Sequence, residues 1–179
     1  MTWEERLFEV FDDLEQQAEG LALLARDAEA SERARDHYTE VDLGARLHAS
    51  IGTEVELVVP GGGAVRGRLL RVATGWCLVE PVSAPAQEVI VNLERLLSAR
   101  GLAPRAAADQ VRGVASRLRL GSALRGVAAE QDAVVLVRVD GEVRRGRFGR
   151  VGAVFVELVG ESGTTEVLPM SALSVVRRV

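Results

Sequence analysis

The chain has 179 residues, of which 47% are hydrophobic, so it can build one ordinary domain or two small ones. Cys77 is the single cysteine, which excludes an intrachain disulfide and a cysteine metal cluster, and its apolar surroundings predict a buried, inert thiol. No apolar run approaches the roughly 20 residues that a membrane span requires, and the acidic start does not resemble a signal peptide, so we expect a cytoplasmic protein.

Residues 1–38 are predicted to form a long acidic amphipathic helix. Residues 1–40 contain 12 acidic residues and 4 arginines, and the rest of the chain contains 14 acidic residues and 18 arginines. The apolar spacing favours self-association as a short coiled coil slightly over packing within the chain. The residues expected to mediate self-association are Trp3, Leu7, Val10, Leu14, Leu21 and Leu24.

Residues 39–104 are predicted to contain a helix followed by five short strands. Thr39 and Asp42 have the spacing of a capping box, and Leu43, Leu47 and Ile51 share one helical face. The strands are expected near residues 54–59, 65–72, 76–80, 88–92 and 96–99.

Residues 105–179 are predicted to contain the same arrangement a second time. Asp140-Gly141 between two β-rich runs indicates a hairpin whose central residues adopt positive φ. A shift of 77 residues places Leu47 on Leu124, and a shift of 79 places Arg66-Gly67-Arg68 on Arg145-Gly146-Arg147. Because the two shifts differ by two residues, one connection must differ in length between the halves, and we predict that it is the one between the second and third strands.

Each half resembles the Sm-like fold, with a helix, an apolar strand, a turn (VDGE in the second half), a glycine-centred strand and an apolar strand ending in Glu. The closing VLPMSALSVV also resembles other SH3-like barrels, including the PRC-barrel, and the whole is similar to uncharacterised bacterial proteins. The resemblance implies a mainly β fold with helices (α+β), in which two five-stranded Sm-like small barrels follow the long helix. The Sm-like Asn and Arg-Gly that hold a base have no equivalents in VATGW, VGAVF, NLERL or PMSAL.

Arginines form the candidate binding site. Alternation along a strand projects Arg66 and Arg68 from one sheet face, and likewise Arg145 and Arg147. These side chains either pair with nearby glutamates as a solvated strand face or bind a nucleic-acid backbone without reading bases. The candidate nucleic-acid-binding residues are Arg66, Arg68, Arg71, Arg144, Arg145, Arg147 and Arg150.

No pattern in the sequence indicates catalysis, a metal site or a cofactor. His37 and His48 have no cysteine or carboxylate partners at ligand spacing, and Trp76 and Phe155 lie in apolar runs typical of a core. We therefore expect a noncatalytic binding or scaffold protein with a protein partner or self-association and no small-molecule substrate. The alternative is an RNA- or DNA-binding protein that uses the arginine-rich face.

Overall fold

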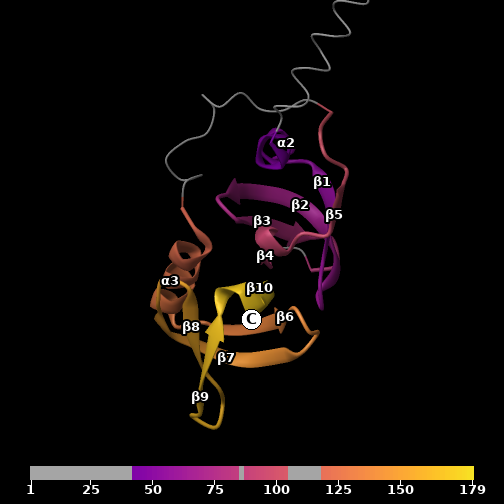
Figure 1. Cartoon of the computed structure of the whole chain (residues 1–179). Helices are drawn as coiled ribbons and strands as arrows, with labels where there is room; N and C mark the ends of the chain where they lie inside the picture. Colours follow the sequence, from indigo (N-terminus) through magenta and orange to yellow (C-terminus); the bar gives the residue numbers. More distant parts are fainter. Residues whose placement is uncertain (1–41, 85–86, 105–117) are drawn as a thin grey trace, which may run out of the picture. The chain divides into compact units, whose positions relative to one another are not determined.

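The computed structural model describes residues 42–84, 87–104 and 118–179, which belong to one compact unit, Asp42–Val179 (Figure 1). We call residues 42–104 the first half and residues 118–179 the second half. The first half contains α2 (Leu43–Ala49), β1 (Glu54–Val59), β2 (Gly63–Ala73), β3 (Trp76–Pro81), β4 (Val89–Asn92), the 3-10 turn η1 (Leu93–Arg95) and β5 (Ser98–Arg100). The second half contains α3 (Leu120–Glu130), β6 (Ala133–Arg138), β7 (Val143–Val151), β8 (Phe155–Val159), β9 (Thr165–Pro169), the 3-10 turn η4 (Met170–Ala172) and β10 (Leu173–Arg178).

The ten strands form one open antiparallel sheet in the order β5-β1-β2-β3-β4-β10-β6-β7-β8-β9. The prediction of two five-stranded barrels is therefore wrong. Closing a barrel would require β4 to pair with β5 in the first half, but β4 pairs with β3 and with β10 of the second half. The hydrogen-bonding edge that would close the first half is used to join the two halves. The predicted helix over residues 1–38 lies outside the described residues and stays a prediction.

The described residues contain two α-helices, both short. The second predicted helix begins at Leu43, and Asp42 caps it by accepting a hydrogen bond from the Gly44 amide at 3.0 Å. The predicted capping residue, Thr39, lies outside the described residues. Ile51 lies beyond the last helical residue and is exposed, so the predicted apolar face ends earlier than the spacing suggests.

The hairpin predicted at Asp140-Gly141 joins β6 to β7, with a turn that differs from the expected one. Gly141 has a φ of 88°, whereas Asp140 has a negative φ. Asp140 instead accepts a hydrogen bond from the Glu142 amide at 3.1 Å, as Asp commonly does in turns. The turn therefore contains one left-handed residue of the Asp-Gly pair, Gly141, and not the two that were expected.

The two halves have matching strand ladders. A shift of 79 residues maps five of the six pairs of β1 with β2 onto the five pairs of β6 with β7. The same shift maps Leu69 opposite Val79 onto Phe148 opposite Leu158. A shift of 77 residues maps β4 onto β9 and β5 onto β10. We call residues related by these shifts counterparts.

The length difference between the halves lies in the connection between the third and fourth strands, not between the second and third. The matched pairs continue through β3 and β8 at the shift of 79, and the shift changes to 77 only at β4 and β9. The connection from β3 to β4 spans residues 82–88, and that from β8 to β9 spans residues 160–164. The sequence placed the difference too early because short apolar segments align almost equally well at either shift.

Two hydrophobic cores stabilise the unit, and each contains residues from both halves. The second-half core, built around Leu124 and Phe148, also contains Trp76 and Ile90 of the first half. The first-half core receives Val137 and Val175 of the second half. The strand pairing of β4 with β10 and this exchange of apolar side chains form what we call the internal junction.

Candidate functional site

Glycine between the paired arginines lets neighbouring strands approach closely. A Cβ at Gly67 would lie 2.1 Å from the carbonyl oxygen of Glu80, and one at Gly146 would lie 2.3 Å from that of Val159. A side chain at either position would therefore push β3 or β8 away. The arginines on either side of each glycine project from the opposite face and are exposed.

In the first half, this arginine face is partly neutralised by Glu56. Glu56 binds Arg66 through its Oε2 atom and Arg100 through its Oε1 atom, the latter at 2.6 Å. The hydrogen bond from Arg66 is the largest influence that lowers the pKa of Glu56, and Arg100 adds to it. This pairing matches the expectation of a solvated strand face. Arg68 forms no ion pair with another described residue.

Arg144 is set apart from the other predicted arginines by its orientation. It alternates with Arg145 and Arg147, and its guanidinium binds Glu142 at 2.8 Å and Glu166 at 3.2 Å. The hydrogen bond to Glu142 is the main cause of its raised pKa. Arg144 therefore joins β7 to β9 and does not extend the face formed by its neighbours.

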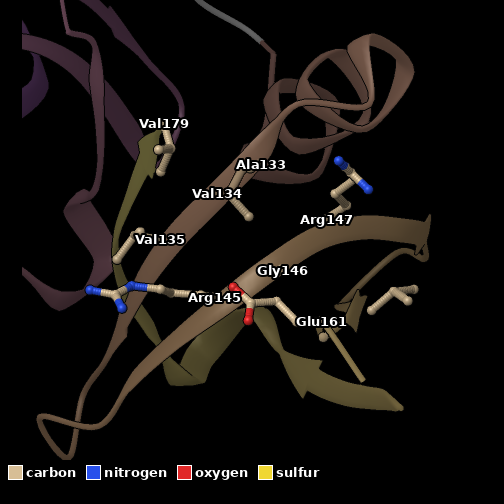
Figure 2. Close-up of a pocket in the computed structure, with 10 residues that line it drawn as sticks. Ala133, Val134, Val135, Arg145, Gly146, Arg147, Glu161 and Val179 are labelled. Carbon is tan, nitrogen blue, oxygen red and sulfur yellow. The ribbon is translucent and has the colours of Figure 1, made fainter. Parts of the chain in front are cut away.

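Arg145 and Arg147 line a pocket of about 490 Å³ beside the start of β6, the middle of β7 and the end of β8 (Figure 2). Glu161 and the apolar side chains of Val135 and Val179 also line it. Neither arginine forms an ion pair within the described part of the chain. This pocket therefore combines two arginines that form no such ion pair with one acidic residue, Glu161.

The first half has a comparable pocket of about 520 Å³ beside Arg66. Arg177 of β10 also lines it, so this pocket combines basic residues from both halves. Arg71 and Arg150 are exposed on their strands but line neither pocket. Of the predicted arginines, the structure thus brings together Arg145 and Arg147.

The predicted self-association residues in the first 24 positions lie outside the described residues.

Asn92 is a buried polar residue of the internal junction that the sequence analysis did not single out. Its Nδ2 atom donates hydrogen bonds to the carbonyl oxygens of Leu173, at 2.8 Å, and Met170, at 3.2 Å. Its Oδ1 atom accepts one from the Glu94 amide at 3.1 Å. The available signal was an Asn inside the apolar run VIVNL, since a buried amide requires partners.

The sheet ends at β5 on one side and at β9 on the other, among the described residues. Edge strands present unpaired backbone amides and carbonyls that can pair with another chain. Phe155 and Val167, at the β9 end, are exposed apolar residues. Phe155 is therefore not the core residue that its apolar neighbours predicted, whereas Trp76 is buried as expected.

No protein-family model and no curated protein matches this chain. In the described ranges there is no cluster of three or more His, Cys, Asp or Glu residues arranged to hold a metal ion. The same ranges contain no helix with the length and hydropathy needed to cross a membrane.

Proposed function

We propose that this chain is a noncatalytic binding protein, or scaffold, that recognises protein partners through the edges of its sheet. One observation carries the proposal: the chain already joins two matching five-stranded halves by pairing the edge strand β4 with the edge strand β10. Strand addition at a sheet edge is a common mode of protein recognition. We further propose that the two halves are copies of one module.

The chemistry of the internal junction indicates how such a partner is bound. Backbone pairing along β4 and β10 supplies the ladder, and buried apolar side chains such as Ile90 and Val176 stabilise it. The remaining ends, β5 and β9, offer the same kind of ladder to another chain. Val167 on β9 provides an exposed apolar side chain at that edge.

The experiment compares capture of proteins by Val167→Lys and by the matched control Val143→Lys. Both valines are exposed strand residues, but Val143 lies on the interior strand β7. Lysine on an edge strand opposes further strand pairing. In nuclease-treated lysate of the cells that naturally produce the chain, we expect Val167→Lys to lose proteins that Val143→Lys retains. Equal capture by the two variants contradicts the proposal.

A second candidate function is binding of a nucleic-acid backbone, which the exposed Arg145 and Arg147 favour. Arg66 is already bound by Glu56, so the second half carries more free positive charge. If this function holds, Arg145→Ala with Arg147→Ala weakens RNA or DNA binding more than Arg66→Ala with Arg68→Ala. Loss of two phosphate contacts reduces the salt dependence of binding by about two units of slope. The unmodified chain and the two double variants are compared for binding to a single-stranded RNA and to a duplex DNA. Equal affinity of all three proteins for each nucleic acid excludes this second function.

A further inference from the structure

We propose that the β5 edge of one copy pairs antiparallel with the β9 edge of a second copy, in the register of the internal junction. This inference rests on the proposed binding function and names its partner as a second copy of the same chain. Each copy offers one edge of each kind, so the contact is head to tail. Contacts of this type build closed rings or open filaments.

The internal junction supplies the register. Its strand pairs are Val91 opposite Val175, Ile90 opposite Val176, and Val89 opposite Arg177. Replacing each residue by its counterpart gives the pairs Leu168 with Ser98, Val167 with Ala99, and Glu166 with Arg100. All six counterparts lie on β9 or β5, the two ends of the sheet.

The β9 edge exposes the apolar residues that the internal junction buries in the first half. Ile90 and Trp76 are 7% and 6% exposed because they pack into the core of the other half. Their counterparts, Val167 and Phe155, are 59% and 38% exposed. These two side chains have the positions of junction residues, but no third set of strands covers them among the described residues.

The β5 edge shows the complementary pattern. Leu43 and Leu97 are exposed, whereas their counterparts in the second half, Leu120 and Ser174, are buried. Ala99, which the register places opposite Val167, is partly buried against the first-half core. Val167 of a second copy would therefore extend that core, as Ile90 extends the core of the second half.

Charge favours the same register. Arg100 and Glu166 would be directly opposite, where opposite charges stabilise a strand pair and like charges destabilise it. Arg100 is exposed and binds Glu56 within its own half, and Glu166 binds Arg144. A second copy therefore links these two pairs into one alternating row of charges.

Two differences make the contact between copies weaker than the internal junction. Pro169 is the counterpart of Asn92, so the hydrogen bonds from Asn92 to Leu173 and Met170 have no equivalent. Asp140 is the counterpart of Gly61, whose lack of a side chain lets its turn approach the Arg138 carbonyl. We therefore expect association that is reversible and depends on concentration.

The test is a charge exchange on the full chain, followed by sedimentation velocity over a range of concentrations. Arg100→Glu places two glutamates opposite each other, and Glu166→Arg places two arginines opposite each other. We expect the unmodified chain to form species larger than a dimer, and each single variant to need at least tenfold higher concentration to do so. An equimolar mixture of the two variants, and the double variant, should both regain assembly.

Both rescues depend on one residue pair and are not expected from self-association through residues 1–38. An unmodified chain that stays monomeric at every concentration overturns the proposal. This outcome includes the case in which another segment of the same chain already covers the β5 or β9 edge. Unchanged assembly of the single variants, or failure of the mixture to assemble, also overturns it. Protein capture that Val167→Lys abolishes, in a chain that stays monomeric, would leave the proposed function standing while rejecting the second copy as its partner.

Discussion

Substituting Gly61 by Ala tests how closely the two halves meet at the internal junction. Gly61 has a φ of +66°, and a Cβ there would lie 2.1 Å from the Arg138 carbonyl oxygen and 2.5 Å from the Gly141 amide nitrogen. Gly63 is the matched control, because its φ is +64° and a Cβ there would meet no atom within 4 Å. The two substitutions therefore share the conformational cost and differ in the contact between halves.

The expected magnitudes follow from these two terms. Alanine in the left-handed region costs about 1 kcal/mol in either variant. In Gly61→Ala, relieving the contact with the Arg138 carbonyl requires a backbone movement of about 1 Å, and overpacking of this kind adds about 2 kcal/mol. Gly61→Ala should thus lower the free energy of unfolding by about 3 kcal/mol, and Gly63→Ala by about 1 kcal/mol.

Urea denaturation followed by circular dichroism measures the difference. With a typical denaturant dependence of about 2 kcal/mol per molar, the midpoint of Gly61→Ala should lie roughly 1 M below that of Gly63→Ala. A difference in unfolding free energy below about 0.5 kcal/mol would show that the turn at Gly61 does not pack against the second half, and would refute the reasoning.

Three further outcomes follow from buried and paired groups. Asn92→Ala removes hydrogen bonds to two carbonyls of the second half and should lower the free energy of unfolding, measured by urea denaturation, by about 2 to 4 kcal/mol. A loss below about 1 kcal/mol would show that these hydrogen bonds do not stabilise the internal junction. Folding lowers the pKa of Glu56 from 4.5, so its stabilisation is present above that pH and is lost as pH falls through the folded-state pKa. Glu56→Gln should therefore flatten the acid limb of stability against pH, and an unchanged limb would contradict the pairing. Burial raises the pKa of Cys77 to about 12, so Ellman's reagent should label the thiol only after unfolding. Rapid labelling of the native chain would show that this core opens.

The sequence predicted the strands well because their signals are local. Alternation around Gly67 and Gly146 marked the glycine-centred strands, and Asp140-Gly141 marked a hairpin. Each of these signals concerns neighbouring residues, whose backbone preferences act wherever the chain folds. The arginine positions on the exposed face followed from the same alternation.

The pairing between halves could not be predicted in this way. Whether β4 closes its own half or pairs with β10 depends on which edge lies nearby in space, and both choices satisfy the same apolar pattern. Asn92 was the one residue whose type pointed to this pairing, because an amide in an apolar strand requires buried hydrogen-bond acceptors. The ion pair between Arg66 and Glu56 likewise depends on the register of β1 with β2.

Crosslinking across the proposed contact tests the central claim most directly. Arg100→Cys with Glu166→Cys places two cysteines in one opposed pair between copies, where cross-strand spacing suits a disulfide. Ala99→Cys with Glu166→Cys is the control, because neighbouring strand residues face opposite sides of the sheet. The native Cys77 thiol is buried and does not compete. Mild oxidation of the full chain should give a ladder of reducible multimers for the first pair, but not for the control. Monomers alone, or equal ladders from both pairs, would contradict head-to-tail pairing of β5 with β9.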